Sequence, residues 1–200
     1  MSSLRRIVMV RHGETEGQSS VRFHGSTDVR LNDEGRDQLR ETARKMKTEV
    51  FDLVVASPLR RSWEGAVIVS GGAPVRLYPE FREVHFGQWE GMTAAEIEES
   101  NPALYRDWQT GAADFEYPGG ELREAFRSRV ARGLEALLAS AATSVLLVGH
   151  KGVIRMIGER LLDVPLLEGP ELGGVVSVSR GADRRWYEGR RGSNPPGLDA

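Results

Sequence analysis

Short apolar runs that end abruptly in polar motifs recur three times along the chain. Residues 7–10, 53–56 and 145–148 consist only of Val, Ile, Leu, Met and Ala. Continuous runs of this length are typical of strands buried on both faces, as in a parallel sheet. The segments 173–179 and 184–187 also have the pattern of strands.

Apolar residues recur at helical spacing in the segments between these strands. Asn32 is a good N-cap and is followed by acidic residues, and Pro58 suits the first turn of a helix. A later helix is expected to stop near Pro165. Alternating strands and helices predict a layered α/β fold. The four predicted apolar stripes are Leu39, Ala43, Met46 and Val50; Leu59, Trp63, Ala66 and Val67; Leu122, Phe126, Val130, Leu134 and Leu137; and Ile154, Ile157 and Leu161.

Each of the three apolar runs leads directly into residues that can carry chemistry. In open α/β sheets, ligands bind beyond the carboxyl ends of the strands. The sequence therefore predicts that two histidines and several arginines meet at one edge of one sheet. The three motifs are Arg11-His12-Gly13-Glu14-Thr15, Ser57-Pro58-Leu59-Arg60-Arg61 and Gly149-His150-Lys151-Gly152.

Composition narrows the classes of function. The 200 residues contain 40% hydrophobic and 28% charged residues, which fits one ordinary domain. The formal net charge of −2 does not favour nucleic acid or an anionic membrane, so an anionic ligand needs a local cationic site. No apolar run approaches the length of a membrane span, and no signal peptide pattern is present, so we expect a cytoplasmic protein.

Several catalytic classes are excluded by missing residues. The chain has no cysteine, which removes a disulfide scaffold, a thiolate nucleophile and a cysteine metal site. It has neither a P-loop nor a Gly-x-Ser-x-Gly motif, and its four histidines lack metal-ligand spacing. We therefore expect no metal and no cofactor.

The motif residues fit phosphoryl transfer. His12 has the place of a nucleophilic imidazole, and neighbouring guanidinium groups disfavour its protonated form. Arg11 and Arg61 have donors suited to phosphoryl oxygens, and His150 is placed to donate a further hydrogen bond. The alternative for each residue, taken singly, is an ordinary strand-end histidine or a solvated arginine.

A leaving alkoxide needs a proton, and Glu83 is the expected general acid. It lies in an unusual segment, residues 81–91, and needs a raised pKa to be protonated near neutral pH. Glu14, Glu80 and Glu90 compete for this role, and a surface salt bridge is the alternative for each.

Taken together and in order, four motifs resemble those of the histidine phosphatase superfamily, the phosphoglycerate-mutase-like family. The resemblance spans Arg6 to Ile157. It implies a three-layer α/β sandwich with a mostly parallel sheet, helices on both faces and a small helical cap. It also implies one domain over residues 1–188 with a cap near 92–120. The composition of residues 189–200, which are rich in Gly, Pro and Arg, predicts a flexible tail. The residues it assigns are Arg11 and Arg61 as phosphate binders, His12 as the phosphorylated residue, Glu83 as the proton donor and His150 as the second histidine.

Some positions depart from the family's usual pattern. Gly17-Gln18 stands where many members have Trp-Asn, and His24-Gly25 stands where many have Gln-Gly. Gly65 replaces a common Thr, and Lys151 replaces a small residue. The predicted substrate-binding residues are Arg11, Gln18, His24, Gly25, Arg61 and Lys151.

The resemblance favours a metal-independent phosphatase that hydrolyses a small phosphorylated metabolite through a phosphohistidine on His12. A phosphoglycerate mutase and a phospho-ligand-binding module without turnover are the alternatives. The short chain leaves less room for the lid of a mutase, which favours the phosphatase. No pattern decides for or against a homodimer. Five aromatic residues either shape a substrate pocket or form the core of the cap: Trp89, Tyr105, Trp108, Phe115 and Tyr117.

Overall fold

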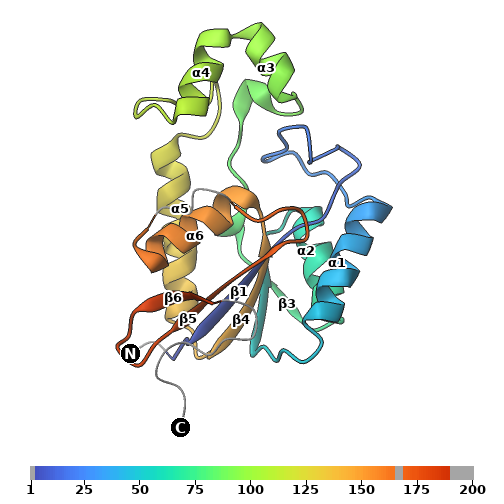
Figure 1. Cartoon of the computed structure of the whole chain (residues 1–200), viewed down its shortest axis with the longest axis vertical. Coiled ribbons are helices and arrows are strands. Elements are labelled where there is room, and N and C mark those ends of the chain that lie inside the picture. Colours follow the sequence, from blue (N-terminus) through green and yellow to red (C-terminus); the bar gives the residue numbers. More distant parts are fainter. Residues whose placement is uncertain (1–2, 165–168, 190–200) are drawn as a thin grey trace.

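Six strands form a single sheet with the order β3-β2-β4-β1-β5-β6 in the computed structural model, which describes residues 3–164 and 169–189 (Figure 1). The first four of these strands in the sheet run parallel, while β5 pairs antiparallel with β1 and β6 antiparallel with β5. The predicted fold class is confirmed. The strands are β1 (Arg6–Arg11), β2 (Leu53–Ala56), β3 (Val75–Leu77), β4 (Ser144–Gly149), β5 (Val175–Arg180) and β6 (Trp186–Gly189).

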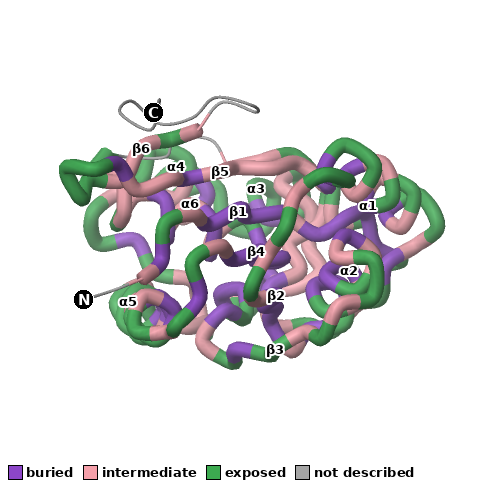
Figure 2. Tube along the Cα trace, turned by 90° about the horizontal axis from the view of Figure 1, so that it is seen from below, coloured by how far each residue is buried: buried purple, intermediate pink, exposed green. Residues whose placement is uncertain are grey.

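Helices cover both faces of this sheet. The helices α1 (Asp33–Lys45) and α2 (Arg60–Val69) pack on one face, and α5 (Arg123–Leu138) and α6 (Lys151–Leu162) pack on the other. Successive side chains of a strand point to opposite faces, so each inner strand contributes to two cores. Val8, Val10, Leu146 and Val148 belong to one core, and Ile7, Met9, Val145 and Leu147 to the other. Figure 2 shows the inner strands mostly as buried tube, with most of the exposed tube at the periphery of the molecule.

Helix α1 begins where the sequence predicts and ends earlier. The side chain of Asn32 accepts a hydrogen bond of 2.8 Å from the amide of Gly35, which makes it the N-cap. The helix ends at Lys45, so the apolar stripe stops at Met46. The expected fourth member, Val50, lies beyond the helix and is 79% exposed. That part of the prediction was wrong.

Helix α2 buries a different face from the one that the apolar stripe predicts. Trp63 and Val67 are 37% and 41% exposed, whereas Arg61 and Gly65 are buried. The buried face follows from polar contacts, because Ser62 donates a hydrogen bond of 2.8 Å to the carbonyl of Val148. A Cβ at Gly65 would lie 3.1 Å from a Leu39 methyl and 3.2 Å from a Val148 methyl, which explains why a larger residue is absent here.

The last helices and strands differ from the predictions only at their ends. Leu122 precedes α5 and is exposed, while the other four residues of its stripe are buried. In α6, Ile154 and Ile157 are fully buried and Leu161 only partly. Strand β6 reaches Gly189, the first residue of the predicted tail. Pro165 and residues 190–200 lie outside the described residues.

The segment between Gly91 and Gly120 rises beyond the carboxyl ends of the strands (Figure 1). It contains α3 (Ala94–Ser100), which starts with a capping box of Thr93 and Glu96, and α4 (Pro102–Thr110). A separate small core holds it together, formed by Trp89, Ile97, Tyr105 and Phe115. The described part of the chain contains no helix of the length and apolarity that crossing a membrane requires.

Candidate active site

The two histidines meet at the carboxyl edge of the sheet, as the strand-end motifs predict. Arg11 at the end of β1 is in register with Gly149 at the end of the neighbouring parallel strand β4. The next residue of each strand is a histidine, and the His12 amide donates 2.9 Å to the Gly149 carbonyl. The two imidazole centroids are 5.3 Å apart, with the rings inclined by 62°. Both histidines are buried, with 4% and 0% of their surface exposed.

The backbone fixes which nitrogen of His12 is free. Nδ1 lies 2.8 Å from the carbonyl oxygen of Gly13, which can only accept a hydrogen bond, so Nδ1 carries the proton. Burial, and then the charge of Arg61, hold the pKa of His12 well below its usual value. The ring is therefore neutral at neutral pH, and its Nε2 has an unshared electron pair for attack.

His150 is oriented by a serine in the second strand-end motif. Ser57 Oγ lies 2.8 Å from His150 Nε2 and already accepts a hydrogen bond from the amide of Leu59. The serine hydroxyl is able to donate to Nε2, and in that arrangement the ring proton of His150 is on Nδ1. Burial, and then Arg61, hold the pKa of His150 well below its usual value, so the ring is a neutral donor.

Arg61 is a fully buried cation held by a loop. Its Nη1 donates 2.7 Å to the carbonyl of Thr27, and its Nη2 donates 2.9 Å and 2.6 Å to the carbonyls of His24 and Gly25. Burial lowers the pKa of Arg61 to about 10, which still leaves it charged at neutral pH. Arg11 is also largely enclosed, and its Nη1 donates 3.2 Å to the carbonyl of Pro170.

Three buried donors near His12 are available to bind an acceptor. Arg11 Nε, Arg61 Nε and His150 Nδ1 have no hydrogen-bond partner among the described residues. Buried polar groups without partners are rare because each one costs about 1–3 kcal/mol. The charges of Arg11 and Arg61 act on both His12 and His150, so these four side chains lie close to one another. The arrangement can therefore hold a tetrahedral anion in front of the free nitrogen of His12.

Glu83 is the carboxyl group that reaches the site formed by the two histidines and the two arginines. Its Oε1 accepts 3.1 Å from the amide of Val84, and its Oε2 accepts 3.0 Å from the amide of Gly152. Burial raises the pKa of Glu83, while these two hydrogen bonds and both arginines oppose the rise. A Cβ on Gly152 would lie 2.5 Å from Glu83 Oε1, so the approach of the carboxyl group requires glycine there.

The competing carboxylates are engaged elsewhere. Glu90 accepts hydrogen bonds from the amides of Ser26 and Phe86 and from the hydroxyl of Thr27, which fixes the loop that holds Arg61. Glu14 accepts from the amides of Thr15 and Ser20. Glu80 is partly exposed and is absent from the cleft lining.

Arg129 of helix α5 is a residue that the sequence did not reveal. Its guanidinium group donates to the carbonyls of Glu80, Arg82 and Glu83, and it forms an ion pair of 2.6 Å with Glu121. It therefore clamps the segment that presents Glu83. A single arginine far away in the sequence carries no local signal for such a role.

A cleft of about 1270 Å³ opens from His12 toward the cap. Of the predicted substrate-binding residues, Arg11, His24 and Lys151 line it, while Arg61 lies behind it. Gly25 acts through its carbonyl on Arg61. Gln18 is exposed and lies outside the lining, on a turn with positive φ.

Four of the five aromatic residues lie both at the cleft and in the core of the cap. Tyr105, Trp108, Phe115 and Tyr117 line the cleft and also pack in the core of the cap. Trp89 belongs to that core alone and is absent from the lining.

The sequence model of the Histidine phosphatase superfamily (branch 1) matches residues 7–182. The chain belongs to this family. Among curated members of the histidine phosphatase superfamily, the chain is 33% identical to the glucosyl-3-phosphoglycerate phosphatase of Mycolicibacterium vanbaalenii, over 88% of this chain and 82% of that protein. It is 31% identical to the adenosylcobalamin/alpha-ribazole phosphatase of Salmonella typhimurium, over 80% and 81% of the two chains.

Solved structures of histidine phosphatases share the fold. The native mycobacterial glucosyl-3-phosphoglycerate phosphatase superposes with a TM-score of 0.81 at 30% identity, covering 92% of this chain and 97% of that one. That enzyme has also been solved in complex with VO3 and with inorganic phosphate. Among the described residues of this chain, no group of three or more His, Asp and Glu side chains is arranged to hold a metal ion.

Proposed function

We propose that this chain is a phosphatase that hydrolyses small phosphate monoesters through a phosphohistidine on His12, without a metal ion. One observation carries the proposal: three buried donors without acceptors belong to residues close to His12, a neutral imidazole whose Nε2 is free. These donors, from Arg11, Arg61 and His150, fit the three equatorial oxygens of a transferring phosphoryl group. Positioning and charge stabilisation are the main demands of that reaction.

In the first step, Nε2 of His12 attacks phosphorus while the bond from phosphorus to the ester oxygen breaks. The carboxyl group of Glu83 gives its proton to the departing oxygen, which leaves as an alcohol. Burial of Glu83 supports this role, because the raised pKa keeps the acid form populated at higher pH than for an exposed glutamate.

In the second step, a water molecule attacks the phosphohistidine. The carboxylate of Glu83 takes a proton from the water, the bond from phosphorus to nitrogen breaks, and inorganic phosphate leaves. His12 returns to its neutral state and Glu83 to its acid form, so the cycle closes without another reactant. The open cleft beside His12 favours hydrolysis over return of the phosphoryl group to a bound sugar acid, as a mutase requires.

The relatives favour a small phosphorylated metabolite as the substrate, since glucosyl-3-phosphoglycerate phosphatase and alpha-ribazole phosphatase are named for such compounds. A lowered pKa of His12 and a raised pKa of Glu83 favour activity on the acidic side of neutrality, as in an acid-type phosphatase. A cytoplasmic location stays a prediction from the sequence.

The test is release of phosphate from p-nitrophenyl phosphate in the presence of EDTA. We expect turnover by the unmodified chain and a loss of at least about 10³-fold for His12→Ala, because the covalent route disappears. His85→Ala is the matched control, since His85 is exposed and lies outside the cleft lining. Rapid quenching should trap an acid-labile phosphoryl group on His12.

Two outcomes would contradict the phosphatase. Binding of phosphate esters without any turnover would favour the binding module. Isomerisation between two phosphoglycerates with little phosphate release would favour the mutase.

A further inference from the structure

The cleft carries more positive charge than a single phosphoryl group requires. The chain as a whole has a net charge of −2, yet six cationic side chains line this cleft against two carboxylates. A cleft lined by one sign of charge concentrates ligands of the opposite sign. The cationic residues are Arg11, Arg22, Arg123, Arg127, Lys151 and Arg155, and the carboxylates are Glu83 and Glu159.

Two of these cations, Arg22 and Arg123, already bind other groups of the protein. Arg22 donates 2.7 Å to the carbonyl of Gly91 and forms an ion pair of 3.1 Å with Glu96. Arg123 donates to carbonyls of the cap segment at Ala112 and Phe115. The guanidinium groups of Arg22 and Arg123 therefore hold the cap segment in place against the rest of the molecule.

Arg155 is likewise engaged, since it forms an ion pair of 3.7 Å with Glu159 one turn further along α6. Arg11 belongs to the phosphoryl site. Two cations at the cleft then remain to be explained, Lys151 and Arg127.

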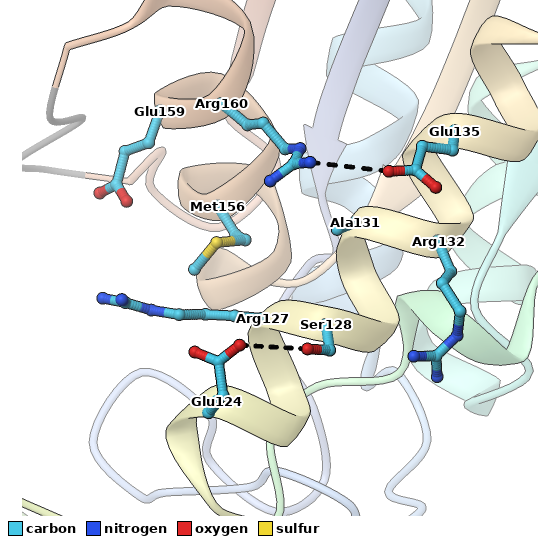
Figure 3. A pocket seen from close by; sticks show the side chains of 9 residues that line it. All are labelled: Glu124, Arg127, Ser128, Ala131, Arg132, Glu135, Met156, Glu159 and Arg160. Atoms are coloured by element: carbon cyan, nitrogen blue, oxygen red, sulfur yellow. Dashed lines mark hydrogen bonds and ion pairs between the residues drawn. The ribbon is translucent and has the colours of Figure 1, made fainter.

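Among the residues that the structure describes, neither Lys151 nor Arg127 has a side chain that forms an ion pair or a hydrogen bond. Both are exposed, and they come from the two neighbouring helices α6 and α5. Figure 3 shows Arg127 extended past Met156 at a hollow between these helices, where Arg160 is held instead by Glu135. Arg127, Met156 and Glu159 line both the hollow and the cleft.

The charges at the phosphoryl site already balance. A phosphate monoester dianion faces the two positive charges of Arg11 and Arg61, because both histidines are neutral. The positive charges of Lys151 and Arg127 are therefore available to bind another part of the ligand. We propose that the substrate's leaving group carries a second anionic group, a carboxylate or a further phosphate, held by Lys151 and Arg127. This inference rests on the proposed phosphatase activity.

The positions of the cationic residues along helix α6 indicate where the second anionic group binds. Lys151 follows His150 directly in the chain, and Arg155 lies one turn beyond, about 6 Å further along the axis. The second anionic group is thus expected on the side of the cleft that α5 and α6 form. Glu159 marks the far limit, because a carboxylate there repels an anion.

The experiment compares two substrates that differ only in charge, 3-carboxyphenyl phosphate and 3-carbamoylphenyl phosphate. At low ionic strength we expect kcat/KM to favour the carboxylate about fivefold to tenfold, the effect of two exposed charge contacts. Lys151→Ala and Arg127→Ala should each reduce this ratio, and the double variant should bring it close to one. Lys47→Ala, which removes an exposed charge far from the cleft lining, should leave the ratio as it is. A third compound, 3-phosphonophenyl phosphate, separates a preference for carboxylate from one for a second phosphate.

Binding of the same compounds to His12→Ala, measured by calorimetry, separates this inference from the proposed function. Equal affinities for the carboxylate and the amide would overturn the second anion subsite even if both compounds are hydrolysed. A charge preference in binding that disappears in the double variant, without turnover by the unmodified chain, would support the subsite and overturn the phosphatase.

Discussion

The phosphoryl site and the rim of the cleft are built in opposite ways. At the phosphoryl site, His12, His150, Arg61 and Glu83 are buried. Hydrogen bonds to backbone carbonyls or amides fix His12, Arg61 and Glu83, and the hydroxyl of Ser57 orients His150. At the rim, Lys151 and Arg127 are exposed long side chains on helices. Preorganised groups in a dry site stabilise a transition state strongly, whereas exposed charges contribute weakly.

This difference gives the two regions separate roles: the phosphoryl site carries out the reaction, and the rim of the cleft selects the substrate. The strand ends hold a charge arrangement that suits any phosphate monoester, while the cap and the helices α5 and α6 form the surfaces that a leaving group contacts. Substitutions at the phosphoryl site should therefore lower kcat, and those at the rim should change KM or the choice among substrates.

The largest of the effects that test this contrast is expected for Glu83→Gln. Glutamine keeps the size of the side chain but has no proton to give, so hydrolysis of an alkyl phosphate should slow about 10²-fold to 10⁴-fold. Hydrolysis of p-nitrophenyl phosphate should slow much less, because that leaving group departs without a proton. Steady-state kinetics with both esters measures the difference. An equal loss on both esters would show that Glu83 is not the proton donor.

The pH profile of the same variant gives a second readout. Glu83 acts in its acid form, and burial raises its pKa, so the activity of the unmodified chain should fall as pH rises through that raised value. His12 acts in its neutral form, and its lowered pKa moves the acidic limb of the profile below the usual histidine range. Glu83→Gln should abolish the basic limb and keep the acidic one.

A smaller effect is expected for Arg129→Met, which removes the clamp on the segment carrying Glu83. The reaction centre stays intact, so kcat should fall about tenfold with little change in KM. The basic limb of the pH profile should also shift, because the surroundings of Glu83 loosen, and Arg129→Lys should recover part of kcat. Arg132→Met is the matched control on the same helix, three residues away and exposed. A lowered melting temperature with an unchanged pH profile would assign Arg129 a structural role only.

The strands and the meeting of the histidines could be predicted because both follow from general rules. Doubly buried parallel strands read as continuous apolar runs, and their carboxyl ends share one edge of the sheet. The sequence therefore places His12 and His150 together, and the register of Arg11 with Gly149 brings them side by side. The predicted N-cap at Asn32 has the same origin, since a local pattern determines a local contact.

Contacts between distant segments could not be predicted in this way. Helix α2 buries Arg61 and Ser62 rather than Trp63, because polar partners on the 24–27 loop and on β4 decide its rotation. Apolar periodicity contains no information about such partners. The same reason hides Arg129, whose backbone acceptors lie in a segment at least 46 residues away.

The smallest effect is expected at the aromatic wall, for Trp108→Phe. Trp108 lies against Phe23 and Tyr105 with ring centroids 5.3 Å and 5.6 Å apart, and phenylalanine preserves most of that packing. The loss of indole surface from the cleft should raise KM for a bulky leaving group about twofold to tenfold, the range of one aromatic contact, and leave kcat unchanged. For a compact ester such as methyl phosphate, which does not extend to the wall, neither constant should change. A drop in kcat for methyl phosphate would mean that the cap positions the catalytic groups, and the separation between a rigid phosphoryl site and a selecting rim would then fail.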